Sequence, residues 1–366
     1  MSRYDSLAKN VITNTLGVQP GDNVIVETWD HGLPIASAFI FNLRELGARP
    51  LLLMEHEETF WRCFDSLEGE KLGKVGEHEW AALEKANSYV FIPGPADLQR
   101  IWKTRSKYIA ATAYNSEWYE KAERIRLKGV RLAFGYASVE QARTYKLSFQ
   151  SWQQMLLTAS SIDFSILKKS IASIKPSLEG NGQIRITAPS GTDLSLRLAK
   201  RDPVAEDCVL DSDDLDKGWN IANVPGGNIV VAPDETSVEG VVAFDRPSPY
   251  MGRWVSGIRW EFKSGQLVKY SAKTSAESFS SVYEKADGDK NRVGRIGIGV
   301  NPKIRKGFLQ DSNSAGAITI WLGNNEDFGG MNKTRFFFPG VLTNATMTID
   351  GHVIVEKGRL RQDMMP

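Results

Sequence analysis

The first half of the chain alternates short apolar runs with segments in which apolar residues recur at helical spacing. The short runs have glycine, proline or polar flanks, and they are residues 23–27, 49–54, 88–92 and 130–134. Residues 33–46 and 79–86 carry the helical pattern between them. Strands separated by helices are typical of βαβ units, so this half is predicted to contain a mainly parallel sheet.

A change of period marks the expected domain boundary. Residues 151–175 predict one long helix, and the polar, glycine-bearing stretch 176–182 follows it. Beyond this stretch apolar and polar residues alternate as in half-buried strands, in runs at 182–188, 193–198, 257–262 and 267–271. One helical pattern, at 275–285, interrupts them. We therefore predict an α/β amino-terminal domain over residues 1–178 and a β-rich (α+β) carboxy-terminal domain over residues 179–366.

Composition narrows the classes of partner. The 366 residues are 42% hydrophobic and 24% charged, which is ordinary for a globular protein of about two domains. A net charge of +1 without a long basic run argues against binding of nucleic acid or of an anionic membrane. Two cysteines, the absence of a signal-type apolar stretch and the absence of a long apolar window predict a cytoplasmic protein.

Two familiar ligand motifs are missing. Thr28–Gly32 stands where a glycine-rich dinucleotide fingerprint would follow the first predicted strand, so a nucleotide-binding domain is not expected. The acidic run Asp211–Asp216 lacks the glycine and the closing glutamate of a calcium loop. It predicts a solvated loop instead.

Four blocks in the second half carry the most specific motifs of the chain. They are Asn223–Pro233, Gly294–Pro302, Gly316–Gly323 and Gly329–Pro339. In this order they resemble the aminopeptidase T/AmpS family of thermophilic metallo-aminopeptidases, which is related to the iron-dependent 2,5-dihydroxypyridine dioxygenases. The resemblance is strong in the second half and only a pattern in the first. It implies an α/β amino-terminal domain, a β-rich catalytic domain and a homodimer.

The resemblance also indicates where the family holds its metals. Its six ligands are two glutamates, two histidines, a tyrosine and an aspartate, and they fall on Asn228, Arg295, Thr319, Glu326, Phe337 and Pro339. A guanidinium repels a cation, and phenylalanine and proline side chains offer no donor atom. We therefore expect no metal at these positions and no cofactor.

The substituted positions suggest a different chemistry. Arg295 could bind a substrate carboxylate, because a guanidinium fork matches that geometry, or it could be a structural arginine. Glu326 could act as a general base, or it could form an ion pair with Arg295. Asn228 and Thr319 could orient a substrate carbonyl or a water molecule, or they could satisfy local backbone groups.

Aromatic residues and a further arginine complete the predicted site. Trp321 and Phe337 would make its walls more apolar and its volume smaller, and Arg335 would add positive potential. Such a pocket suits a small aromatic or amino-acid-like carboxylate better than a peptide.

Three functions follow from this reading. The first is a diverged, metal-independent enzyme that acts on such a small-molecule substrate. The second is a non-catalytic pseudo-peptidase that binds a ligand. The third is a metal-dependent aminopeptidase or hydrolase whose ligands are displaced from the expected positions.

Overall fold

The structure, a computed structural model, describes residues 2–68, 71–103, 107, 117–118, 120–250, 253–306 and 310–364. The chain divides into two compact units. We call residues 1–164 and 208–226 the amino-terminal unit, and residues 165–207 and 227–366 the carboxy-terminal unit. Each is described by itself below.

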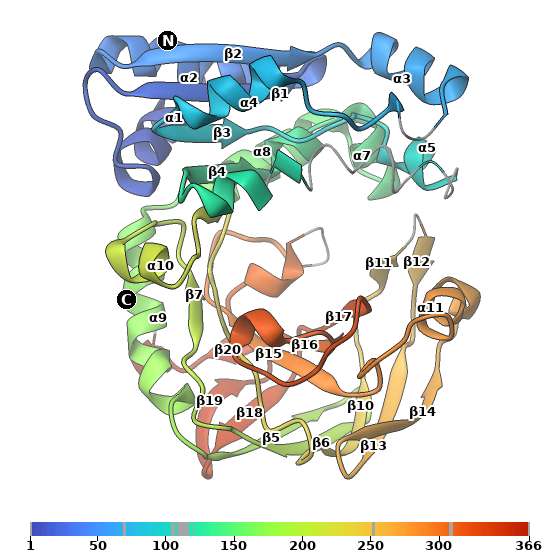
Figure 1. Ribbon diagram of the computed structural model, residues 1–366. Coiled ribbons are helices and arrows are strands. Elements are labelled where there is room, and N and C mark those ends of the chain that lie inside the picture. The colour runs from blue at the N-terminus through green and yellow to red at the C-terminus, as the bar shows by residue number, and fades with distance from the viewer. Residues whose placement is uncertain are drawn as a thin grey trace. The chain divides into compact units, whose positions relative to one another are not determined.

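The amino-terminal unit contains a five-stranded parallel sheet. Its strands are β1 (Asn23–Trp29), β2 (Arg49–Glu55), β3 (Ser88–Phe91), β4 (Lys128–Leu132) and β8 (Ile221–Val224). They lie in the order β2-β1-β3-β4-β8 (Figure 1). The four strands predicted in the first half, and the parallel sheet, are confirmed. The last strand, β8, comes from the segment 208–226, which returns to this unit from later in the chain.

Helices connect these strands. The α-helices are α1 (Asp5–Asn10), α2 (Leu33–Leu46), α3 (Glu57–Ser66), α4 (Glu77–Glu84), α5 (Leu98–Lys103), α7 (Val139–Thr144), α8 (Phe149–Ser160) and α10 (Ser212–Asp216). Short π- or 3₁₀-helical pieces are η1 (Val11–Thr15), η2 (Asp30–Gly32) and η4 (Ala133–Tyr136). Helix α2 has the predicted bounds and ends at Gly47, whose φ of 90° closes it in the left-handed conformation.

One hydrophobic core cluster of this unit lies on the sheet face to which odd-numbered residues of β1 and β3 point. Ile25, Tyr89 and Phe91 pack there against Leu83 of α4 and against Trp118. Side chains alternate along a strand, so Glu27 of β1 belongs to the same face. A carboxylate therefore lies next to an apolar core.

Two sequence predictions need correction. The long helix expected at 151–175 is two helices, α8 and α9 (Phe164–Leu178), because the backbone leaves the helical conformation at Ser161, where φ is −92° and ψ is 18°. The acidic run at 211–216 is the short helix α10, not a loop. The Asp211 side chain accepts hydrogen bonds from the backbone N–H groups of Asp213 and Asp214, and so caps the helix.

The carboxy-terminal unit is dominated by antiparallel strands, as predicted. They are β5 (Gln183–Ala188), β6 (Thr192–Arg197), β7 (Val204–Glu206), β9 (Asn228–Val231), β10 (Glu239–Ala243), β11 (Ser248–Tyr250), β12 (Arg253–Val255), β13 (Arg259–Lys263), β14 (Gln266–Ser271), β15 (Val293–Gly299), β16 (Ile318–Gly323), β17 (Phe337–Leu342), β18 (Thr346–Ile349), β19 (His352–Glu356) and β20 (Arg359–Leu360). Its helices are α9, α11 (Ala276–Tyr283), η5 (Asp311–Asn313), η6 (Glu326–Phe328) and η7 (Gln362–Met364).

These strands form an eight-stranded and a five-stranded sheet and the hairpin β11–β12. The larger sheet has the order β14-β13-β10-β6-β5-β18-β19-β20, and the smaller has the order β17-β16-β15-β9-β7. Trp260 of the larger sheet lies 5.8 Å from Phe338 of the smaller sheet, ring centroid to centroid, and both are fully buried. The face of the five-stranded sheet that bears Phe338 therefore meets the core, and its neighbours Phe337 and Pro339 point to the opposite face.

The division into units differs from a single boundary at residue 178. The units separate at the start of α9, whereas the sequence places the boundary at the end of this helix. The segment 208–226 also returns to the amino-terminal unit. The pattern of apolar residues cannot predict this return. Strand β8 is only four residues long, and its pairing with β4 joins residues about 90 positions apart.

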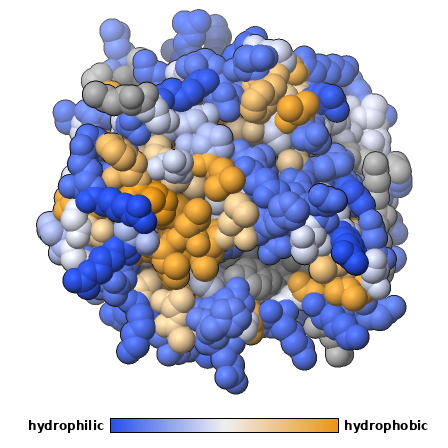
Figure 2. All heavy atoms as spheres, turned by 90° about the horizontal axis from the view of Figure 1, so that it is seen from above, coloured by the Kyte–Doolittle hydropathy of each residue, from blue (hydrophilic) through white to orange (hydrophobic). Residues whose placement is uncertain are grey.

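Exposed apolar side chains gather on one part of the amino-terminal unit. Leu33, Phe41 and Leu46 of α2 are exposed, and so are Leu51, Leu52 and Met54 of β2. Strand β2 lies at the end of its sheet, and a group of hydrophobic residues is exposed on the face shown in Figure 2. In the described part of the chain, no helix combines the length and the apolar composition needed to cross a bilayer.

Candidate functional site

Strand register brings most of the predicted site residues onto one face of the five-stranded sheet. Arg295 on β15 lies opposite Trp321 on β16, and Trp321 lies opposite Pro339 on β17. Thr319 lies opposite Gly297, and Asn228 on β9 lies opposite Gly299. Because paired residues and residues two apart share a face, these side chains, with Phe337, point away from the core.

Arg295 is a part-buried cation between aromatic rings. Its guanidinium carbon lies 4.3 Å from the ring centroid of Phe328 and 4.9 Å from that of Phe337. Both Nε and Nη2 donate to the carbonyl oxygen of Asn324, each at 3.3 Å. Among the described residues no carboxylate lies within ion-pair distance of it. Burial lowers the pKa of Arg295, against the opposing influence of Asp327 and Glu206.

Glu206 is a site residue that the sequence did not reveal. It lies opposite Asn228 on the edge strand β7, and Asn228 Nδ2 donates to its Oε2 at 2.9 Å. Burial raises the pKa of Glu206, although the hydrogen bond from Asn228 and the charge of Arg295 act to lower it. A three-residue strand gives no periodic signal, so only the pairing with β9 exposes this carboxyl group as a member of the site.

Asn228 and Thr319 each keep a polar atom without a partner. Asn228 Nδ2 also donates to Oδ1 of Asn313, but within the described residues its own Oδ1 has no hydrogen bond. The same holds for Oγ1 of Thr319, a residue that is fully buried. Buried polar atoms in native proteins normally have partners, so the unpaired oxygen of Asn228 is a position where a ligand or water can bind, whereas complete burial closes off that of Thr319.

Trp321 fills much of the space beside Thr319. A Cβ atom at position 297 would lie 2.8 Å from the indole ring, so the ring rests on the backbone of Gly297. Trp321 is 9% exposed. The indole therefore provides an apolar surface beside Gly297.

Two predicted residues do not join this arrangement. Glu326 Oε1 lies 3.6 Å from Nζ of Lys333 at the surface, and its Oε2 accepts from Nδ2 of Asn324 at 3.3 Å. It forms no ion pair with Arg295, so that interpretation of the sequence is corrected. Arg335 is exposed on the segment before β17 and makes no hydrogen bond or ion pair within the described residues.

The loop that carries Asn324 is anchored by a buried carboxylate. Glu235 is fully buried and accepts from Nη1 of Arg201 at 2.8 Å and from Nη2 at 3.0 Å. The same carboxylate accepts from Nδ2 of Asn325 and from the backbone N–H of Met331, each at 2.8 Å. Burial alone would raise the pKa of Glu235, but these hydrogen bonds hold it below its usual range. The acceptor of the Arg295 hydrogen bonds is thus part of a fixed loop.

A family comparison places this geometry in context. The family model described as thermophilic metalloprotease (M29) matches residues 1–328. The chain belongs to the M29 family. No curated protein sequence matched it.

Two solved structures share the fold of this M29 chain. Wild-type AmpT from Thermus thermophilus has a TM-score of 0.74 and 19% sequence identity, and the match covers 98% of each chain. A 2,5-dihydroxypyridine dioxygenase from Pseudomonas putida KT2440 has a TM-score of 0.64 and 15% identity, covering 99% of this chain and 98% of the other. The predicted combination of an α/β domain and a β-rich domain is therefore confirmed.

The M29 description implies a metal, so the donor set of the sheet face can be compared with what a metal needs. Within the described residues, no group of three or more His, Cys, Asp or Glu side chains is placed to hold a metal ion. The face offers the Glu206 carboxylate, the Asn228 amide and the Thr319 hydroxyl beside a guanidinium, whereas two dications need several anionic or imidazole donors. These residues do not fit a two-metal site, and we derive no catalytic step through a metal.

Proposed function

We propose that this M29 protein is a metal-independent enzyme that acts on a small aromatic or amino-acid-like carboxylate at the Arg295 face. The observation that carries the proposal is the state of Arg295 itself. A part-buried guanidinium without a carboxylate partner among the described residues is destabilised by desolvation, and a ligand anion would offset that cost. A planar fork also suits a carboxylate group.

Neighbouring residues supply the other contacts that this ligand needs. Phe337 is 40% exposed, so an aromatic ring or apolar side chain of the ligand can pack on it while the carboxylate binds Arg295. The free oxygen of Asn228 can accept a hydrogen bond from an amino or hydroxyl group. These contacts together favour a compact ligand over an extended peptide.

Two carboxyl groups are candidates for proton transfer. Glu326 is the candidate from the family motif, and Glu206 is the candidate from the geometry. Burial raises the pKa of Glu206, and a perturbed pKa is common among groups that act as general acids or bases. The substitution Glu206→Gln should preserve ligand binding and lower turnover, because the amide keeps the shape of the carboxyl group but cannot exchange the proton.

A second candidate function is ligand binding without turnover. The packing of Trp321 on Gly297 and the complete burial of Thr319 favour it, because they leave little room for an attacking water molecule beside these residues. In that case the Arg295 contacts with a carboxylate would be retained, and no product would form.

The test begins with a panel of small aromatic and amino-acid carboxylates, each paired with its neutral amide. Thermal shift and calorimetric titration identify binders, and mass spectrometry of the incubated mixture identifies products. Arg295→Ala is compared with Arg185→Ala, which removes a fully exposed arginine on the other sheet. Binding that requires both the carboxylate and Arg295 supports the proposal, and product formation distinguishes the enzyme from the binding protein. Equal binding of acids and amides would contradict it.

We also propose that the protein forms a homodimer, as the resemblance implies. The exposed apolar side chains of α2 and β2 are a surface that such a partner would cover. The substitutions Leu51→Asp and Leu52→Asp together should shift the molar mass measured by analytical ultracentrifugation toward the monomer. An unchanged mass would place the interface elsewhere.

A further inference from the structure

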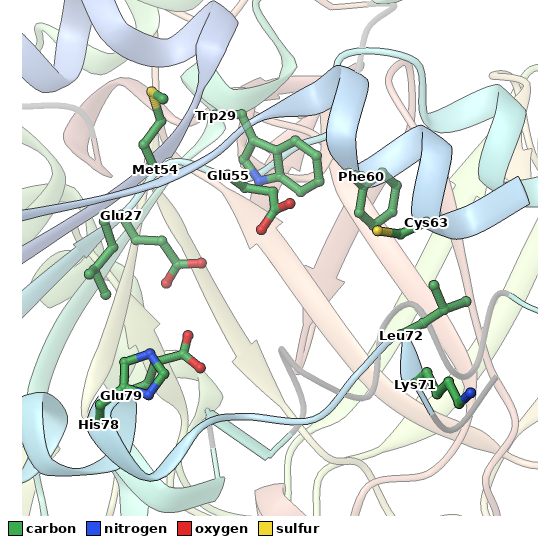
Figure 3. Close-up of a pocket in the computed structure, with 11 residues that line it drawn as sticks. Glu27, Trp29, Met54, Glu55, Phe60, Cys63, Lys71, Leu72, His78 and Glu79 are labelled. Carbon is green, nitrogen blue, oxygen red and sulfur yellow. The ribbon is translucent and has the colours of Figure 1, made fainter. Parts of the chain in front are cut away.

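A pocket of about 340 Å³ lies within the amino-terminal unit, at the carboxyl ends of two parallel strands. Strand β1 contributes Glu27 and Trp29, and the neighbouring strand β2 contributes Glu55, its last residue. Open parallel sheets commonly bind ligands at the carboxyl ends of their strands. Helices α3 and α4, and the segment between them that carries Lys71 and Leu72, supply the remaining walls (Figure 3).

Glu27 is the deepest charged group of this pocket. It is 9% exposed, and its carboxylate has no hydrogen bond or ion pair among the residues that the structure describes. Figure 3 shows the carboxylate directed into the open space of the pocket. A buried carboxylate costs free energy unless a cation or a hydrogen-bond donor compensates it. Its position is therefore that of a binding group, not of a structural ion pair.

Two further glutamates direct their carboxylates into the same space (Figure 3). Glu79, in the first turn of α4, accepts from the backbone N–H of Gly76 at 2.7 Å, which fixes its orientation. Glu55 is exposed and stands nearer the solvent than Glu27. The three carboxylates thus extend from the surface to the floor of the pocket, whereas Lys71 is exposed on another part of the lining.

Aromatic rings form the opposite wall. The ring centroids of Trp29 and Phe60 are 4.9 Å apart with their planes at 76°. A Cβ atom at position 94 would lie 2.4 Å from the Trp29 ring, so the ring is seated on the backbone of Gly94. Leu72 extends the apolar lining. An aromatic face next to carboxylates attracts a cation that carries an apolar body.

We propose that this pocket binds a small organic amine, whose protonated nitrogen contacts Glu27 while Glu55 and Glu79 add negative potential, and whose apolar body packs on Trp29 and Phe60. The ligand class is a monovalent organic cation, not a metal ion. A metal would need a compact group of donors, and no such group of three occurs among the described residues. The pocket volume is also in the range of small-molecule sites.

The titration of the pocket follows from the same geometry. Burial, followed by the charges of Glu79 and Glu55, raises the pKa of Glu27 to about 8. Burial also raises the pKa of Glu55, together with Glu79 and Asp30, and His56 opposes the shift. A bound ammonium would favour the ionised form of Glu27. Affinity for an amine should therefore increase as the pH rises through about 8, provided that the amine stays protonated.

The experiment uses the full chain and benzylamine as the probe, with benzyl alcohol as its neutral counterpart. Calorimetric titration at pH values below and just above the pKa of Glu27 measures affinity, and buffers of different ionisation enthalpy measure proton release. Saturable binding of benzylamine with release of a proton below that pKa is the expected result. At the higher pH, Glu27→Gln should weaken the affinity for benzylamine by about tenfold or more.

Glu77→Gln is the matched control, because Glu77 is exposed, lies on the same helix as Glu79 and does not line the pocket. It should change the affinity by less than about twofold. Thermal melting of both variants verifies that they are folded. Equal loss in the two variants, equal binding of benzyl alcohol, or no saturable binding at millimolar benzylamine would overturn the proposal. Competition by Mg²⁺ or Ca²⁺ that abolishes amine binding would assign the pocket to a metal instead.

Discussion

The amino-terminal pocket and the carboxy-terminal sheet face each hold a charge among aromatic rings, but the two charges have opposite signs. Arg295 faces Phe328 and Phe337, and Glu27 shares a pocket with Trp29 and Phe60. Within the described residues neither has an ion-pair partner. A guanidinium cannot lose its proton near neutral pH, so it needs an anion to offset its desolvation. A carboxylate can take up a proton instead, so its pocket can be charged or neutral.

Because of this difference, Arg295 would bind an anionic ligand at any pH near neutrality, whereas Glu27 would bind a cationic ligand only in its ionised form. The Glu235–Arg201 pair provides the reference for both, because there a buried charge has a bidentate partner and two further hydrogen bonds. Comparing the paired group with the two unpaired groups shows which buried charges stabilise a loop and which are available to ligands.

The largest effect is expected when the paired charge loses its partner. Arg201→Ala should lower the free energy of unfolding by about 3–5 kcal/mol, because Glu235 would remain buried without its counter-ion. Chemical denaturation measures the change. Lys333→Ala, which removes one member of an exposed pair with Glu326, is the control and should have a much smaller effect. Similar losses in both variants would show that burial does not distinguish these pairs.

Removal of the unpaired cation should affect binding more than folding. Arg295→Ala should weaken binding of the carboxylate ligand by about 2–4 kcal/mol. Arg295→Lys should retain only part of the wild-type affinity, because an ammonium group cannot reproduce the two parallel hydrogen bonds of a guanidinium. Calorimetric titration of the two variants against the same ligand measures both changes. Wild-type affinity in Arg295→Ala would identify this arginine as a structural residue.

The unpaired anion should make stability depend on pH. The pKa of Glu27 is about 8 in the folded protein and 4.5 in the reference state. Its protonated form is favoured by folding, so its contribution is fully present below about 4.5 and is lost as the pH rises through about 8. Within that window stability should fall by up to about 1.4 kcal/mol per pH unit from this group. In Glu27→Gln the slope of unfolding free energy against pH should be smaller by this amount, and an unchanged slope would contradict the assignment.

The smallest expected effect is that of metal ions. Because the donors at the Arg295 face do not fit two dications, neither zinc, cobalt, manganese nor iron should raise the melting temperature, and a chelator should not lower it. Metal content is measured on the purified chain by elemental analysis. One or two bound transition-metal ions per chain, with metal-dependent cleavage of leucyl or phenylalanyl substrates, would restore the metallo-aminopeptidase interpretation.

The sequence was informative where a periodic pattern extends over many residues. The predicted strands and helix α2 of the amino-terminal unit follow from such patterns, and so do the alternating strands of the carboxy-terminal unit. Short elements carried no comparable signal. Helix α10 depends on one side-chain cap, and the break between α8 and α9 depends on the backbone conformation of Ser161.

Individual site residues show the same limit. The resemblance of the motif blocks grouped Arg295, Asn228 and Thr319, whereas their common sheet face follows from the strand register of the structure. The partners of Glu206 and Glu235 could not be predicted from the sequence. Asn228, the partner of Glu206, is 22 residues away and is brought near by strand pairing. Arg201, the partner of Glu235, is 34 residues away and is brought near by a loop. For Glu27, the sequence shows only a polar residue in an apolar strand. Its raised pKa arises from burial and from the glutamates on α4 and β2, and both are properties of the fold.

The indole of Trp321 has a consequence for the redesign of this protein. Its ring rests on Gly297, which lies opposite Thr319, so the space beside this backbone is occupied whatever residues stand at the other positions. Histidines and carboxylates introduced nearby one at a time would therefore place polar groups against an aromatic ring. A designed metal site on this face would require a small residue at position 321 first, so the order of the substitutions, and not only their number, would decide whether an ion can enter.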